Sequence, residues 1–114
     1  MRKLFTMLII GTLILTFSLT GSAQMKFLAI ATGGTGGTYY PLGGALAQML
    51  SNKLDGVIVT AQTGNASIAN CNLIGRNQIE TAFSQANTTY WAYSATGLLA
   101  DTEPIENLRA IASL

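Results

Sequence analysis

Hydrophobic positions follow two different periods along this chain. Three short, mostly apolar runs stand out, at residues 26–32 (KFLAIAT), 57–61 (VIVTA) and 79–84 (IETAFS). Runs of this length and composition are typical of strands buried in a parallel sheet. After the first two runs, apolar residues return every three or four positions, as they do on one face of a helix, and a short aromatic segment follows the third run. The pattern therefore predicts strands that alternate with helices.

Three helices are predicted after these strands: from Pro41 to the Asp55-Gly56 turn, over residues 67–76, and over residues 87–93. Pro41 fits a first helical turn, because its missing N–H has no partner to lose there. Residues 96–107 are expected to form a loop, and residues 108–114 (LRAIASL) a strand that is cut in mid-course. This order predicts an α/β fold with a parallel sheet and helices on both faces.

The first 23 residues have a different pattern. Arg2 and Lys3 make a short basic start, residues 4–19 are uncharged and largely apolar, and residues 20–23 are small. Together these three parts are typical of a secretory signal peptide. The alternative is an uncleaved membrane anchor, but the uncharged run is shorter than the roughly 20 residues that span a bilayer. We expect cleavage after Ala23 and a periplasmic mature chain, residues 24–114.

Composition excludes several kinds of chemistry. The chain has 6 Lys+Arg against 5 Asp+Glu, no His and a single Cys. Without His there is no Ser/His/Asp triad and no His-ligated metal site, and one Cys allows no internal disulfide. The near-neutral charge disfavours nucleic acid as a partner. We therefore expect no metal and no cofactor, and we expect Cys71 to be a small core residue.

The predicted binding chemistry lies in loops, because ligands of such sheets bind at the carboxyl ends of the strands. Residues 33–40 (GGTGGTYY) follow the first strand. Their glycines expose backbone N–H groups, and the next helix start adds a partial positive charge that favours an anion. Neither the dinucleotide nor the P-loop spacing is present. A small carboxylate is the expected ligand, and a simple tight turn is the alternative.

Two further loops follow the second and third strands. In residues 63–67 (TGNAS), Asn65 or Ser67 is a candidate either for ligand contact or for capping the next helix. In residues 84–87 (SQAN), the Gln85 amide suits a carboxylate, whereas Asn87 is a candidate helix cap.

The loops and their surroundings resemble the TAXI family of substrate-binding proteins, which serve tripartite ATP-independent periplasmic (TRAP) transporters. The resemblance covers residues 26–114 and is carried by the runs ATGGTGGTYYPLGGALAQMLSNKL, VTAQTGNASIANCNLI, TAFSQANTTYWAYSATG and ENLRAIASL. It implies a type II periplasmic-binding-protein fold, in which two α/β lobes close on a small organic anion or an amino acid such as glutamate. Membrane subunits of the transporter would then import that ligand.

Family members are about three times as long, so residues 24–114 would be an incomplete N-terminal lobe. The resemblance assigns ligand contacts to nine residues: Thr35, Gly36, Gly37, Thr38, Tyr39, Asn65, Ala66, Ser67 and Gln85. The chain departs from the family at two loops. Residues 84–87 (SQAN) stand where Gln-Ser-Asp is common, and residues 63–67 (TGNAS) stand where Thr-Gly-Gly-Ser is frequent. These differences bear on the identity of the ligand more than on ligand binding itself.

Two other functions are compatible with the sequence. One is a periplasmic sensory module with the same fold. The other is an α/β enzyme, although no loop holds a His or Lys to act as a general base. We expect a binding protein without catalytic activity.

Overall fold

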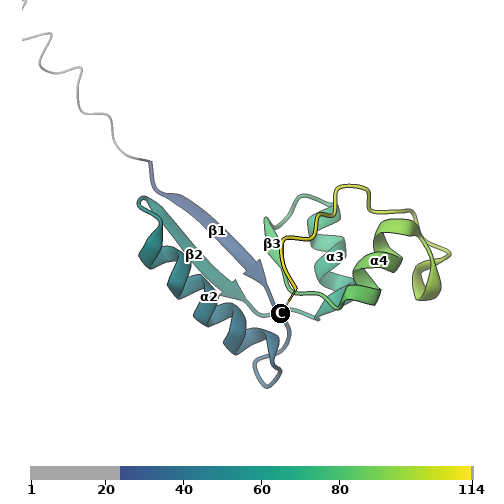
Figure 1. Cartoon of the computed structure of the whole chain (residues 1–114), viewed down its shortest axis with the longest axis horizontal. Coiled ribbons are helices and arrows are strands. Elements are labelled where there is room, and N and C mark those ends of the chain that lie inside the picture. Colours follow the sequence, from purple (N-terminus) through teal and green to yellow (C-terminus); the bar gives the residue numbers. More distant parts are fainter. Residues whose placement is uncertain (1–23, 114) are drawn as a thin grey trace, which may run out of the picture.

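The structure is a computed structural model that describes residues 24–113. The predicted signal peptide, residues 1–23, lies outside the described residues. The elements run in the order β1 (Lys26–Ala31), α2 (Tyr39–Lys53), β2 (Val57–Gln62), α3 (Ser67–Gly75), β3 (Thr81–Ala82), α4 (Ala86–Ser94) and the 3-10 helix η2 (Gly97–Leu99). Figure 1 shows α2 lying along β1 and β2, with α3 and α4 gathered beside β3. The predicted α/β class is confirmed.

The three strands form a parallel sheet in the order β2-β1-β3. β1 pairs with β2 along its whole length, from Lys26↔Val57 to Ala31↔Gln62. It pairs with β3 only at its end, where Ile30 and Ala31 face Thr81 and Ala82. Since β2 and β3 lie on opposite sides of β1, right-handed crossovers place α2 and α3 on opposite faces of the sheet.

Helix α2 packs on one face of β1 and β2. Ile30, Val59 and Ala47 form the buried core there, with Leu28 and Leu50 packed against them. The helix approaches the sheet closely at Gly43, where an added Cβ would lie 2.5 Å from the Thr32 methyl group. A glycine is therefore required at this contact, because any side chain would push helix and sheet apart.

Helices α3 and α4 build a second, separate core. Cys71, Ala92 and Leu108 are its buried members, and Ile105 packs against them. The Cys71 thiol lies 3.4 Å from the Ser84 hydroxyl. The prediction that Cys71 is a core residue is thus confirmed, and among residues 24–113 it has no disulfide partner.

Two predicted strands differ from the structure. The strand expected over residues 79–84 is reduced to Thr81–Ala82, and residues 108–113 form no strand. Leu108 is instead buried between α3 and α4, while Ile111 is 83% exposed. An extended segment becomes a strand only when a neighbouring strand offers hydrogen bonds along its length, and β3 pairs with β1 at two residues only.

The close contact at Gly43 generates a paired prediction. Gly43→Ala should lower the free energy of unfolding by about 1–3 kcal/mol, because the new methyl group overpacks the interface with Thr32. Gly44→Ala, one residue along the same helix, should raise it by about 0.5–1 kcal/mol, since nothing lies within 4 Å and alanine favours helix. Urea unfolding of both variants measures the difference. Equal effects would contradict the tight packing of α2 on the sheet.

Candidate functional site

Three loops meet at the edge of the sheet where the strands end, which we call the binding edge. They are loop one (residues 33–38), loop two (63–66) and loop three (83–85), and they follow β1, β2 and β3 respectively. Because the strands are parallel, all three loops leave the same edge. The Gly64 N–H donates to the Gly33 carbonyl oxygen at 3.2 Å, which joins loops one and two. The prediction that these loops lie together is borne out by the geometry.

Loop one projects from the protein with open space above its backbone. Thr35, Gly36, Gly37 and Thr38 are all exposed, and the loop closes through a bond from the Gly37 N–H to the Gly34 carbonyl oxygen at 2.9 Å. None of its glycines has φ in the left-handed region. A Cβ added to Gly34 or Gly36 would meet nothing within 4 Å.

Loop one was predicted either to contact a ligand or to be a simple tight turn. A tight turn demands glycine where φ is positive or where a side chain would collide, and neither holds at Gly36. The missing side chain there leaves the backbone open to an incoming group. Residues 34–37 form a turn closed by a hydrogen bond, but neither its backbone angles nor a collision requires glycine at position 36.

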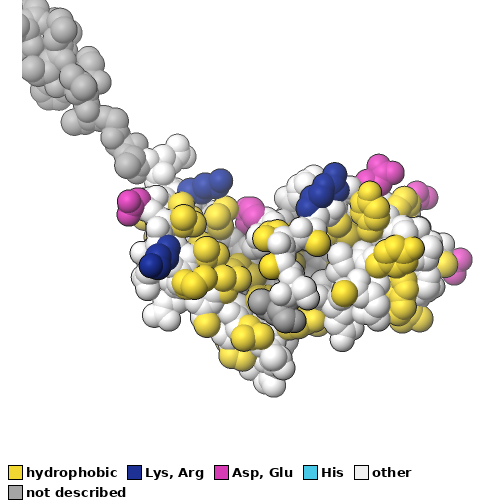
Figure 2. Space-filling model, in the orientation of Figure 1, with side chains coloured by type: hydrophobic (Ala, Val, Ile, Leu, Met, Phe, Trp, Pro, Cys, Tyr) yellow, Lys and Arg dark blue, Asp and Glu magenta, His cyan; other side chains and the backbone are white. Residues whose placement is uncertain are grey.

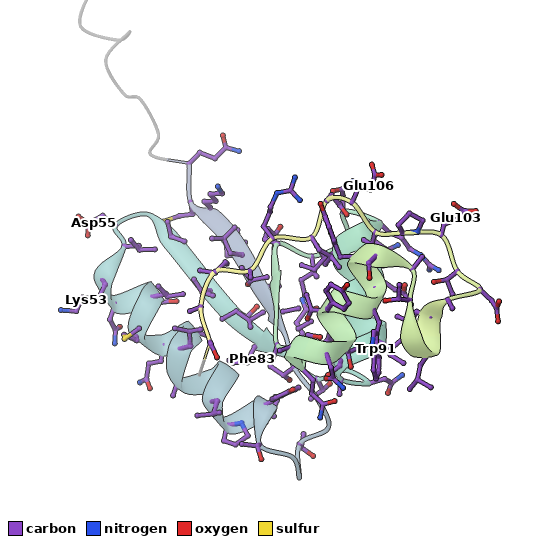
Figure 3. The ribbon with its side chains drawn as sticks, turned by 45° about the vertical axis from the view of Figure 1, so that its right-hand side comes forward. Lys53, Asp55, Phe83, Trp91, Glu103 and Glu106 are labelled. Atoms are coloured by element: carbon purple, nitrogen blue, oxygen red, sulfur yellow. The ribbon has the colours of Figure 1, made fainter. Side chains whose placement is uncertain are left out.

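Tyr39 forms the wall between loop one and loop three. Its ring is half-buried and stacks on Phe83, with ring centroids 5.4 Å apart and planes inclined by 23°. Phe83 also approaches α2, since a Cβ on Gly43 would lie 3.4 Å from its ring. Figure 3 shows Phe83 where β3 gives way to loop three. Sequence reasoning placed Phe83 only in a strand, although an aromatic residue at a strand end was a usable signal.

Loop two holds an unusual backbone conformation. Ala66 has φ 61° and ψ −151°, in a region that only glycine adopts without cost. It is the N-cap residue of α3, and neither Asn65 nor Ser67 caps the helix with its side chain. Asn65 is exposed, and the Ser67 hydroxyl instead accepts a bond from the Gln85 N–H at 3.0 Å. The capping alternative for these two residues is wrong, and Ser67 joins loop two to loop three.

Loop three presents Gln85 at the start of α4. Its backbone carbonyl accepts the first helical bond, from the Thr89 N–H at 2.9 Å, and the residue is exposed. The N-cap of α4 is Gln85 itself, without a side-chain hydrogen bond, so the alternative in which Asn87 caps this helix is wrong.

Helices α2, α3 and α4 all begin at the binding edge, and none has a side-chain cap. The first N–H groups of a helix have no partner inside it, and together they carry a partial positive charge. In α3 the helical ladder begins only at Asn70, whose N–H donates to the Ala66 carbonyl oxygen at 2.9 Å. Three sets of uncapped donors thus open at one edge, which is favourable for an anionic group.

No Asp, Glu, Lys or Arg occurs in loops one, two or three. Figure 2 shows the charged side chains at other parts of this face. Lys53 and Asp55 lie at the far end of α2, and Glu103 and Glu106 lie in the segment after η2 (Figure 3). Any hydrogen-bond donors that the three loops offer at the binding edge are therefore uncharged.

A surface hollow of about 280 Å³ lies elsewhere, at the carboxyl end of α3. Its lining includes Asn72, Arg76, Glu103 and Glu106. Since α3 runs away from the binding edge, this hollow is separate from the three loops.

The fold is an α/β lobe in which the loops that follow three parallel strands gather at one edge. Residues 30–114 match the NMT1-like family, and the chain belongs to that family. The family is one of periplasmic solute-binding proteins, so a small-molecule ligand and an extracytoplasmic location follow. Within residues 24–113, no helix combines the length and the apolar character needed to cross a membrane.

The conformation of Ala66 leads to a second prediction. Ala66→Gly should raise the free energy of unfolding by about 1 kcal/mol, because glycine removes the strain at this φ and ψ. Ala69→Gly, inside α3, is the matched control and should lower it by about 0.5–1 kcal/mol. Thermal unfolding followed by circular dichroism measures both. A destabilised Ala66→Gly variant would show that the backbone at this position is unstrained.

Proposed function

We propose that this chain is the extracytoplasmic solute-binding component of a TRAP transporter of the TAXI family. It captures a small carboxylate or amino acid, with glutamate as the representative ligand, and hands it to the membrane subunits for import. The observation that carries the proposal is the convergence of three uncapped helix starts and the open glycine loop at one edge. The resemblance of residues 26–114 to the TAXI family supports it.

Binding on this edge proceeds without covalent chemistry. Backbone N–H groups of loop one and of the α3 and α4 starts donate to the carboxylate, and the hydroxyls of Thr35, Thr38 and Ser67 add donors. Tyr39 supplies an apolar wall beside them, held by its stacking on Phe83. The Gln85 amide offers both a donor and an acceptor to a polar group on the ligand. No side chain in the loops is suited to general-base catalysis.

The direct test is a titration of the whole chain, uniformly labelled with ¹⁵N, with L-glutamate, succinate and, as an uncharged control, glucose. Carboxylates should shift the backbone amide signals of Gly36, Gly37, Ser67 and Ala86, whereas glucose should leave them in place. Shifts confined to other surfaces, or none at all, would refute the binding edge. Uptake of the bound solute by cells that co-express TRAP membrane subunits then tests the transport role.

A third prediction concerns Gly36. Gly36→Val should weaken L-glutamate binding about tenfold, because the side chain enters the space that the carboxylate needs, while the free energy of unfolding stays within about 0.5 kcal/mol of the unmodified chain. Gly44→Ala is the control, since it fills equally open space on α2. Isothermal titration calorimetry gives the affinities. Undiminished binding by Gly36→Val would return loop one to the role of a turn.

A fourth prediction concerns pH. The loops contain no Asp, Glu, His, Lys or Arg, and the carboxylates of L-glutamate stay ionised above about pH 5.5. The Kd for L-glutamate should therefore change less than about twofold between about pH 5.5 and about pH 8.5. Calorimetry across this range provides the measurement. A tenfold change would mean that an ionisable side chain contacts the ligand.

A further inference from the structure

Asn70 is a fully buried polar side chain directly beneath the binding edge. It lies in α3 and is 0% exposed. Its Nδ2 donates to the carbonyl oxygens of Thr32 at 2.9 Å and Phe83 at 2.7 Å, and it lies 3.4 Å from that of Ala31. Three carbonyl oxygens around one atom require that atom to be the amide nitrogen. One side chain thus holds the carboxyl ends of β1 and β3 together.

The other end of the same amide faces loop two. Asn70 Oδ1 has no hydrogen-bond partner among the described residues. A Cβ built on Gly64 would lie 3.2 Å from this oxygen and 3.1 Å from the Thr32 carbonyl oxygen. Gly64 is therefore packed tightly between Asn70 and the end of β1. Asn70 thus lies against loop two at Gly64, against loop three at Phe83, and against Thr32, the residue that leads into loop one.

The position of these carbonyl oxygens matters for an anion. Each carbonyl presents its negative end, and an unpaired buried carbonyl costs about 1–3 kcal/mol. By donating to those of Thr32 and Phe83, Asn70 satisfies them and turns them inward, away from the edge where N–H groups are exposed. Loss of this donor would leave repulsive groups under the binding edge and free the loops to separate.

We propose that Asn70 is the positioning residue of the binding edge. It contacts no ligand and acts through the backbone: it holds loops one, two and three in one fixed relation, so that their N–H groups converge on a single carboxylate. The ligand part of this inference rests on the function proposed above, whereas the coupling of the three loops stands on the contacts of Asn70 alone.

Amide hydrogen exchange in the whole chain tests the coupling without any ligand. Asn70→Ser should speed exchange of the Gly64 and Phe83 amides by about tenfold or more, because the bonds from Gly64 to Gly33 and from Phe83 to Ala31 lose their common support. The amides of Ile30 and Val59, in the core beneath α2, should keep their protection. Asn72→Ser, an exposed change in the same helix, is the control and should alter none of these rates.

A uniform increase at all four amides would mean that Asn70 only adds global stability, and it would overturn the proposal. Unchanged exchange at Gly64 and Phe83 would overturn it as well. If Asn70→Ser does not fold, Gly64→Ala perturbs the same contact from loop two. The proposal then requires faster exchange at Phe83, which Gly64 does not touch, and a response limited to loop two would refute it.

Binding of L-glutamate supplies the second arm. Asn70→Ser should weaken it at least about fivefold, and Asn72→Ser should leave it unchanged. Full affinity in Asn70→Ser would overturn the positioning role. If the unmodified chain itself binds no carboxylate, the proposed function fails, and the exchange experiment still decides whether Asn70 couples the loops.

Discussion

Parallel pairing of β1 with both of its neighbours is the constraint on which this molecule depends. It brings the ends of three strands to one edge, and with them three loops that are far apart in the sequence. Pairing with β3 is confined to two residue pairs, so the ladder alone fixes that side weakly. The Asn70 amide donates to the carbonyl oxygens of Thr32 and Phe83, the residues that directly follow β1 and β3, and so supports that side.

The same constraint sets the electrostatics of the binding edge. Helices that follow parallel strands all begin at that edge, so their unpaired N–H groups gather there. The neighbouring carbonyl oxygens of Thr32 and Phe83 are occupied from within. Donors therefore face outward and acceptors face inward, and an anion is favoured without any charged side chain. In the proposed function, this edge binds the carboxylate group and leaves the rest of the ligand to other contacts.

Local sequence signals predicted the helices and strands whose hydrophobic pattern can be recognised within one segment. The predicted ends of β1, β2 and the three helices all lie within two residues of the observed ends. These elements were predictable because their hydrophobic periods reflect burial against neighbours on one or two faces. Cys71 followed from the same periodicity. The predictions failed for two segments whose strand character depends on pairing with a neighbour: β3 has two residues, and residues 108–113 form no strand.

Within the candidate site the division is similar. Glycines, hydroxyl residues and Gln85 after the strands indicated the loops, and the topology brings them together. Helix caps at Asn65, Ser67 and Asn87 were reasonable from residue type, yet the Ser67 hydroxyl turns to the Gln85 N–H instead. A hydroxyl near a helix start has several donors within reach, and residue type does not choose among them.

The sequence by itself determined the α/β class, the order of elements and the three loops, because these follow from local composition and period. Only the tertiary structure decided the roles of Asn70, Phe83 and Ala66. Asn70 and Phe83 act on partners that are distant in sequence, and the positive φ of Ala66 is found at the N-cap of α3, where residue type gave no sign of it. Such contacts depend on where separate segments meet in space, which no local pattern encodes.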